Sequence, residues 1–388
     1  MKSVGYFVLL FVFGLVGCSE NKTSTLRGPV HLSADVTVHQ LSAQEKSPFL
    51  SRKIQLDQNT SCEDRIAKMV CLSKNTQADF DRDCEFGHVP AGVIQKLQKI
   101  MEELPPVHRK VFCHLDRIQL HQNIFSIGYA TQVQDEWGMP AGYMFGMRED
   151  VLNGSGKDYF SWKEQLNFGL SDPHDDKARV SPEGPTVQVE MNSANPTLLY
   201  VMTHELSHIV DMLNGADNID YDKCQTSPVH NYWKDCPVPS TAFNSISWGP
   251  HMTVIDDSQD VDWNHAEMPD NKYFWSASHP LYAKFCFYFC GGKTLPPNDV
   301  QASYQELQNS TFLTSYSTSS PMEDFAEASA LWALGDSGRD LGIVVKDKAG
   351  IALFDSRQQM LNPELQSKLK WLHEFYNRGN LKTDAAVN

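Results

Sequence analysis

Residues 195–215 read NPTLLYVMTHELSHIVDMLNG, and this stretch decides the fold prediction. Asn195 is a good N-cap residue, and Pro196 stands at the first helical position, where its missing N–H costs nothing. Gly215 is the expected stop signal. The stretch therefore predicts one well-delimited helix.

The two faces of this helix carry different residue types. Leu206, Ile209, Val210 and Leu213 form an apolar face, whereas His204, His208 and Asp211 recur at i, i+4 and i+7 on another face. Two histidines four residues apart can share one Zn²⁺, and the intervening Glu205 then lies beside the open coordination position as a general base. A chance match is the alternative, because an HExxH string arises at random in about one chain of this length in a hundred.

A catalytic zinc needs a third protein ligand and an open fourth position. The residues after His208 lack the Gly and His of the metzincin pattern, so we expect a carboxylate from a downstream helix. The segment 320–327, Ser-Pro-Met-Glu-Asp-Phe-Ala-Glu, offers one. Ser320 followed by Glu323 is equally a capping box, and periodicity alone leaves ligand and cap equally favoured.

Two segments resemble the catalytic domain of anthrax-lethal-factor-like zinc peptidases: HELSHIVD at 204–211, and LTSY at 313–316 followed by EDFAEA at 323–328. The resemblance implies that Glu323 is the third zinc ligand. It implies that Tyr316, seven residues earlier, points at the zinc-bound oxygen and that Glu327 orients a ligand histidine.

The chain departs from that family in three places. Ser207 replaces a common Gly, Asp324 replaces an aromatic residue, and the insertion between the two segments is longer. These departures bear on substrate choice more than on the metal.

Each role also has a physical rationale. One Zn²⁺ held by His204, His208 and Glu323 would activate a water, with Glu205 taking its proton, and a phenol at Tyr316 would stabilise the developing oxyanion. Asp211 either orients a ligand histidine or is solvated. A peptide substrate could add as a strand to a sheet edge formed by the segment with Tyr143 and Phe145, although an ordinary core strand is the alternative.

The N-terminus predicts export. Lys2 precedes an apolar run, Gly5 to Gly17, that is too short to span a bilayer and has signal-peptide proportions. The run ends in Leu15-Val16-Gly17-Cys18, which resembles the bacterial lipobox; a plain signal peptide with an incidental Cys18 is the alternative. Ser19 is not the Asp that retains lipoproteins at the inner membrane, which favours the outer membrane. We therefore expect an extracytoplasmic protein, lipid-anchored to the bacterial envelope through Cys18.

Cysteine usage and charge agree with this compartment. Of nine cysteines, eight remain besides Cys18, which fits four disulfides of unassigned pairing in an oxidising compartment. Thiolate zinc sites would need paired CxxC spacing, which the sequence lacks. The formal net charge of −15 argues against nucleic-acid binding.

The expected organisation is a signal peptide at 1–17, a lipid-attached spacer at 18–59, a Cys-rich extension at 60–88 and a metallopeptidase domain at 89–388. An insertion at about 215–278 interrupts the domain, with Cys224 and Cys236 as its expected tie. The predicted fold is α+β and zincin-like: a small mixed sheet, the active-site helix and a mostly helical C-terminal half. Besides the helix at 195–215, we expect strands at 124–133, 143–148 and 186–190, and helices at 93–103, 105–120, 280–290, 298–308, 321–334 and 363–376.

The predicted function is hydrolysis of peptide bonds in protein or peptide substrates. Two alternatives stay open. One is a catalytically inactive zincin-fold lipoprotein that binds or scaffolds, which an intact Glu205 disfavours. The other is a zinc hydrolase of cell-wall cross-links.

Overall fold

The computed structural model describes residues 60–73, 84–122, 124, 126–135, 140–153, 156–171, 180–216, 225–226, 232–237, 239–248, 251–255, 280–285, 287 and 294–383. The expected signal peptide, Cys18 and the spacer up to residue 59 lie outside these residues. So does most of the insertion at 215–278.

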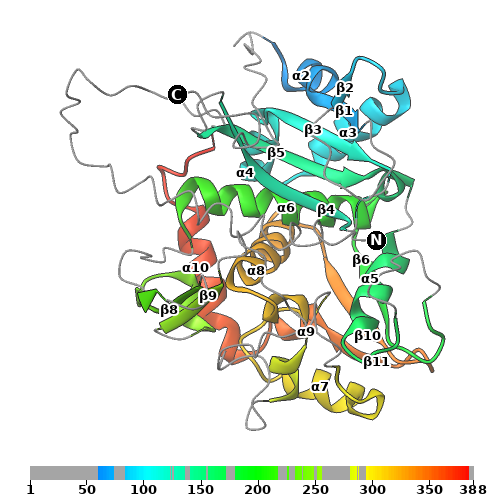
Figure 1. Cartoon of the computed structure of the whole chain (residues 1–388), viewed down its shortest axis with the longest axis vertical. Coiled ribbons are helices and arrows are strands. Elements are labelled where there is room, and N and C mark those ends of the chain that lie inside the picture. The colour runs from blue at the N-terminus through cyan, green and yellow to red at the C-terminus, as the bar shows by residue number, and fades with distance from the viewer. Residues whose placement is uncertain are drawn as a thin grey trace, which may run out of the picture.

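The chain folds as a mixed α+β structure built on a five-stranded mixed sheet (Figure 1). Strand pairing is parallel between β1 and β3 and between β3 and β5, and antiparallel for the two outer pairs. The strands, in spatial order, are β2 (Cys84–Phe86), β1 (Val70–Ser73), β3 (Arg117–His121), β5 (Pro140–Arg148) and β4 (Gly128–Gln134). The predicted α+β class with a small mixed sheet is confirmed.

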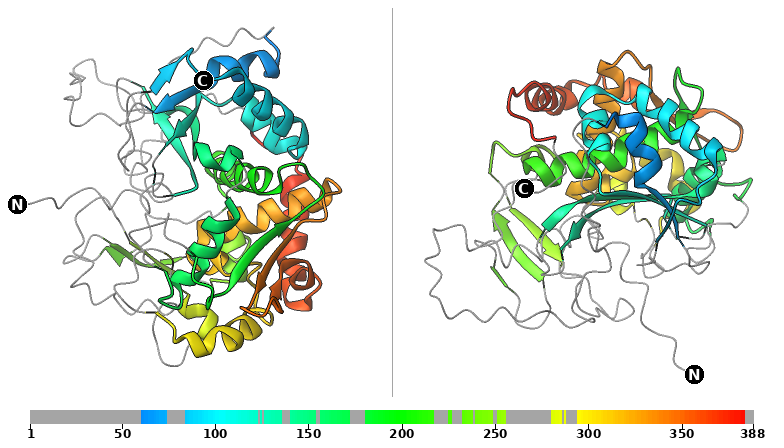
Figure 2. Two further views of the ribbon diagram at one scale, coloured as in Figure 1. Left: turned by 90° about the vertical axis from the view of Figure 1, so that its right-hand side faces the viewer. Right: turned by 90° about the horizontal axis from the view of Figure 1, so that it is seen from above.

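Helices from the first half of the chain lie on one side of this sheet, as the right panel of Figure 2 shows for α2, α3 and α6. Their apolar faces form the main core together with the inward-facing residues of β3 and β5. The helices are α2 (Cys62–Met69), α3 (Ala91–Glu103), α4 (Pro106–Cys113) and α6 (Pro196–Asn214). A 3₁₀ turn, η2 (Glu149–Asn153), and helix α5 (Gly156–Leu166) follow the sheet.

Two smaller sheets complete the β structure. One has the order β11-β10-β6, and its members are β6 (Thr186–Glu190), β10 (Gly342–Lys346) and β11 (Ala352–Asp355). The other belongs to the insertion, with β7 (Gln225–Thr226), β8 (Tyr232–Pro237) and β9 (His251–Ile255). We did not predict β10 and β11, which lie between helices α8 and α9.

Helix α8 packs directly against α6 beneath the five-stranded sheet (Figure 1). This contact brings together two segments that lie more than a hundred residues apart in sequence. The C-terminal elements are α7 (Val300–Leu307), α8 (Pro321–Asp336), α9 (Ser356–Gln359) and α10 (Gln366–Tyr376), with the 3₁₀ turns η4 (Phe243–Ile246), η5 (Leu281–Lys284), η6 (Pro297–Asp299), η7 (Tyr316–Thr318) and η8 (Pro363–Leu365).

Two predicted helices need correction. The helix expected at 105–120 ends at Cys113, and β3 begins at Arg117 after a short turn. The strand, Arg-Ile-Gln-Leu-His, alternates polar and apolar residues over only five positions. Ile118 also continues the helical spacing of Val111 and Leu115, which favoured the longer helix in the prediction. In the helix expected at 280–290, the described residues form only η5.

A buried polar network joins the four helices α4, α6, α8 and α10. His108 Nε2 of α4 lies 2.9 Å from Ser207 Oγ, and Ser329 Oγ of α8 donates to that same oxygen at 2.9 Å. Tyr376 of α10 bonds to Ser329 and approaches His108. The network fixes α6 against α8 through hydroxyl contacts that involve no metal-ligating atom.

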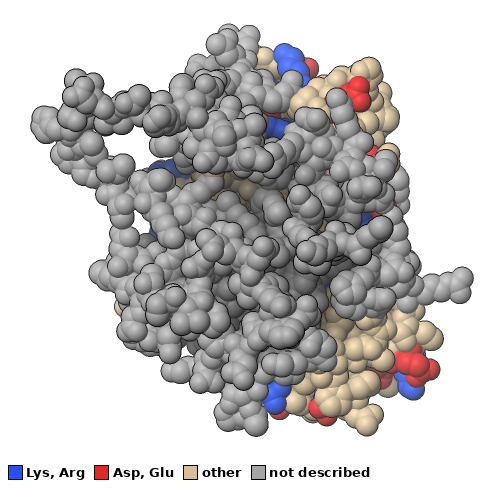
Figure 3. Space-filling model, viewed as in Figure 1, with Lys and Arg blue, Asp and Glu red and all other residues tan. Residues whose placement is uncertain are grey.

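One disulfide ties the N-terminal segment to helix α4, and a second closes a loop within that segment. Cys62 pairs with Cys113, and Cys71 pairs with Cys84. The side chains of the other cysteines after Cys18 lie outside the described part. Disulfides favour an extracytoplasmic compartment. Among the described residues, no helix combines the length and apolar character needed to cross a bilayer. Figure 3 shows charged side chains of both signs interspersed on the described surface of one face.

Candidate metal centre

Helix α6 positions the histidine pair as its sequence predicted. It begins at Pro196 and ends at Asn214, and the positive φ of 63° at the following Gly215 lets its backbone N–H reach Asp211 O. Asn195 precedes the helix but makes no capping hydrogen bond through its side chain. The rings of His204 and His208 lie on one face with their centroids 4.9 Å apart.

Glu323, from the first turn of α8, completes a cluster with the two histidines. Its Oε2 lies 3.0 Å from His204 Nε2 and 3.4 Å from His208 Nε2. One ligand atom from each of the three residues falls within 4.8 Å of the others, so the group could hold a metal ion. The family resemblance implied this set of three.

Periodicity equally favoured two roles for Glu323, a metal ligand and part of a helix cap, and the two roles are compatible. The backbone N–H of Glu323 donates to Ser320 Oγ at 3.2 Å, so Ser320 caps α8. The Glu323 carboxylate extends toward the histidines. Capping therefore fixes the start of the helix that presents the candidate ligand.

The donor set fits a metal ion. Glu323 Oε2 is buried, and although both Nε2 atoms approach it, no described residue donates a well-formed hydrogen bond to it. Nitrogen and oxygen atoms that converge without bonding one another are expected of ligands around a cation. Burial opposes ionisation of Glu323, but the two histidines outweigh it and hold the pKa of this carboxyl well below its usual range.

Glu327 lies behind His204, as the resemblance implied. Its Oε1 is 2.9 Å from His204 Nδ1, and it also accepts hydrogen bonds from Tyr200 and Thr314. Burial lowers the pKa of His204, but the carboxylates of Glu323 and Glu327 outweigh it and raise that pKa to about 10. A carboxylate at Nδ1 orients the ring and leaves Nε2 for a metal, which would displace a proton on binding.

Glu205 is buried, with 6% of its surface exposed, beside the start of β4. A Cβ at Gly128 would come within 2.9 Å of Glu205 Oε1, so only glycine leaves room for the carboxylate there. Burial raises the pKa of Glu205, while the nearby histidines oppose this. A raised pKa suits a carboxylate that accepts and returns a proton near neutral pH.

Tyr316 stands at the start of η7, with its ring centroid 6.2 Å from that of His204. Phe287 packs edge-on against the ring, and Lys163 Nζ lies 3.4 Å from its centroid. Burial, followed by the charge of Glu323, raises the pKa of Tyr316 well above its usual value. The phenol thus stays protonated and is a hydrogen-bond donor at neutral pH.

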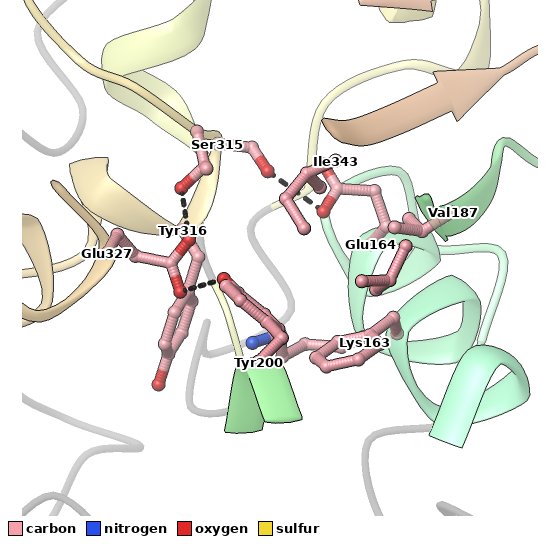
Figure 4. Close-up of a pocket in the computed structure, with 11 residues that line it drawn as sticks. Lys163, Glu164, Val187, Tyr200, Ser315, Tyr316, Glu327 and Ile343 are labelled. Atoms are coloured by element: carbon pink, nitrogen blue, oxygen red, sulfur yellow. Dashed lines mark hydrogen bonds between the residues drawn. The ribbon is translucent and has the colours of Figure 1, made fainter. Parts of the chain in front are cut away.

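A pocket beside the cluster contains residues that we did not predict: Lys163, Glu164 and Tyr200 (Figure 4). Glu164 accepts hydrogen bonds from Tyr304 and Ser315. The only sequence signal was a Lys-Glu pair inside the otherwise hydrophobic segment Tyr-Phe-Ser-Trp-Lys-Glu-Gln-Leu at 159–166.

Asp211 is buried, so the solvated alternative is wrong. Its Oδ1 accepts a hydrogen bond from the backbone N–H of Ala216 at 2.8 Å, just beyond the end of α6. The side chain therefore helps to close the C-terminus of the helix, a role that resembles local capping.

The prediction of a substrate-binding edge at Tyr143 and Phe145 is wrong. Strand β5 pairs with β3 on one side and β4 on the other, and both side chains are buried. They belong to the core, which was the alternative. An outer strand of the described sheet is β4, which carries Gly128 next to Glu205.

Comparison of the chain with protein-family models, curated proteins and solved structures finds no match.

Proposed function

We propose that the chain is an extracytoplasmic zinc-dependent endopeptidase similar to the anthrax-lethal-factor-like peptidases. The observation that carries the proposal is the convergence of His204, His208 and Glu323, with Glu205 on the same helix as both histidines. Two imidazoles and one carboxylate form a ligand set typical of catalytic zinc. When bound, zinc supplies Lewis acidity toward a carbonyl and lowers the pKa of a water to about 7.

The chain's own groups account for the remaining chemistry. Glu205 takes the proton of the attacking water and delivers it to the leaving amine. Tyr316 donates a hydrogen bond to the oxyanion that develops on the substrate carbonyl, an effect of about 3 kcal/mol per donor elsewhere. Glu327 holds the His204 ring in register through Nδ1.

The open edge of β4 suits an extended substrate. β4 is paired only with β5 among the described strands, and Gly128 at its start lies against Glu205. A peptide that added to this edge as another strand would run past the general base. We place the substrate backbone there.

The decisive experiment compares Glu205→Gln with wild type, using Glu183→Gln at an exposed position as the matched control. We expect Glu205→Gln to lose hydrolysis of casein-derived peptides while one zinc per chain remains, and the control to match wild type. Hydrolysis that survives in Glu205→Gln would refute the mechanism. Glu323→Ala should lose zinc; unchanged occupancy would leave Glu323 with only its capping role.

The same assay run on peptidoglycan fragments addresses the cell-wall alternative. Cleavage of fragments but not of peptides would replace the proposed substrate class. Wild-type protein that contains no zinc and cleaves neither would favour a binding or scaffold lipoprotein.

Anchoring through Cys18 is part of the proposal. It is supported by the sequence preceding Cys18 and by the two disulfides, which fit an exported protein. Metabolic labelling with a fatty-acid analogue should mark wild type and not Cys18→Ala. Equal labelling of both would remove the anchor from the proposal.

A further inference from the structure

Lys163 is a buried cation beside the candidate metal centre. It projects from α5, and only 7% of its surface is exposed. Its side chain runs toward the ring of Tyr316 (Figure 4). Apolar side chains line other parts of the same pocket: Phe160, Val187, Val189 and Ile343.

No carboxylate of the described residues forms an ion pair or a hydrogen bond with the Lys163 ammonium group, although four glutamates act on its charge from a greater distance. Its near neighbours are aromatic rings: Nζ lies 3.4 Å from the centroid of Tyr316, 5.6 Å from that of Phe160 and 5.9 Å from that of Phe287. Rings stabilise a cation through their faces, but they accept none of its hydrogen bonds as strongly as a carboxylate does. Lys163 therefore has donor capacity to spare.

The carboxylates that line the pocket are already occupied. Glu164 accepts from Tyr304 and Ser315, and Glu327 accepts from Tyr200 and Thr314. Burial lowers the pKa of Lys163, whereas the surrounding glutamates, Glu327 foremost, act in the opposite direction and favour the charged form. The glutamates compensate the charge of Lys163 at a distance but accept none of its N–H donors, and an incoming carboxylate would accept them directly.

We propose that this pocket binds a carboxylate group of the peptide substrate, with Lys163 as the group that recognises it. The apolar walls suit the methylene stem of an acidic side chain; a C-terminal carboxylate is the other source of the same chemistry. A monoanion fits better than a phosphate dianion because Glu164 and Glu327 would repel a second charge. Tyr316 and Glu327 border both pocket and metal centre, so the bound group belongs to a residue near the scissile bond.

The inference rests on the proposed peptidase function, and its test separates the two. Peptide sets would carry Glu, Gln or Leu at each position flanking the scissile bond, and a second set would end in a free carboxylate or its amide. We expect wild type to prefer Glu over Gln at one position by at least tenfold in kcat/KM. Lys163→Met should bring that ratio close to one, Lys163→Arg should retain it, and Lys348→Met, at an exposed lysine, should leave it unchanged.

Because Lys163 touches Tyr316, overall activity in Lys163→Met is expected to fall, and the ratio between matched peptides is the informative quantity. The inference would be overturned if wild type hydrolysed the Glu and Gln peptides at equal rates and also hydrolysed peptides with a free or an amidated C-terminus at equal rates. This comparison uses wild type alone, so it holds even if the Lys163 variants do not fold. A preference confined to the free C-terminus would identify that source.

Binding measured calorimetrically on the Glu205→Gln protein gives a readout without catalysis. One outcome is that wild type hydrolyses no peptide, that the protein still binds the Glu peptide more tightly than the Gln peptide, and that Lys163→Met removes this preference. This result would support the carboxylate pocket and reject the peptidase function. Equal binding of Glu and Gln peptides would reject the pocket.

Discussion

Gly128→Ala offers a measure of how tightly Glu205 is held. The new Cβ would lie 2.9 Å from Glu205 Oε1 and 3.2 Å from its Cγ, about 0.5 Å short of ordinary van der Waals contact. The carboxylate must move by about that amount, since it is the flexible partner. A misplacement of ~1 Å at a reacting group costs ~100-fold, so we expect kcat to fall about tenfold for this shift.

The assay follows kcat on a fluorogenic peptide in zinc-saturated protein, together with zinc content and the unfolding midpoint. Zinc should stay bound, because the atoms nearest to the new Cβ belong to Glu205 and not to His204, His208 or Glu323. Gly335→Ala on α8 is the control, since a Cβ there meets nothing within 4 Å. Wild-type kcat in Gly128→Ala would refute the placement of Glu205 as the base.

Three further predictions concern stability. Lys368→Met should lower the free energy of unfolding by about 3–5 kcal/mol in urea titrations, because it leaves Asp324 buried without its ion-pair partner. Replacing both residues by apolar ones should recover most of this loss. A double variant as unstable as Lys368→Met would contradict this explanation. Burial lowers the pKa of His108 to about 3, so its neutral form stabilises the fold fully above pH 6.5 and this contribution is lost as pH falls toward 3. With a chelator present, the free energy of unfolding should therefore fall less steeply between pH 6 and pH 4 in His108→Gln than in wild type, by about 1.4 kcal/mol per pH unit. Equal slopes in the two proteins would refute this role of His108. Replacing Cys62 and Cys113 by Ala should cost about 4 kcal/mol, given their separation of 51 residues, and a change below 1 kcal/mol would show that the loop is constrained by other contacts.

The sequence predicted α6 and α8 well because local chemistry delimits them. Proline at the first position of each, Gly215 after α6 and Ser320 before α8 are signals that act within a few residues. By contrast, β3 was predicted as helix, because it alternates polar and apolar residues over only five positions and Ile118 continues the helical spacing of Val111 and Leu115. β10 and β11 were not predicted: β10 pairs with β6, about 150 residues away, and β11 pairs with β10.

The same distinction holds for the site. His204, Glu205 and His208 are close in sequence and follow from one helix period. Glu323 needed a resemblance to known peptidases, because periodicity could not separate a ligand from a cap. Lys163 could not be predicted as a site residue from the sequence, because its role depends on the residues that pack around α5 in the folded protein.

The hydroxyl contact between Ser207 and Ser329 has a consequence for how an ion would exchange. It couples α6 and α8 through hydroxyl groups that are not metal ligands, so this contact between the two helices does not depend on a cation. Stripping and reloading should therefore be reversible at constant fold, and different divalent ions should compete on coordination preference alone. The ion can therefore be exchanged, whereas the contact between Ser207 and Ser329 stays in place.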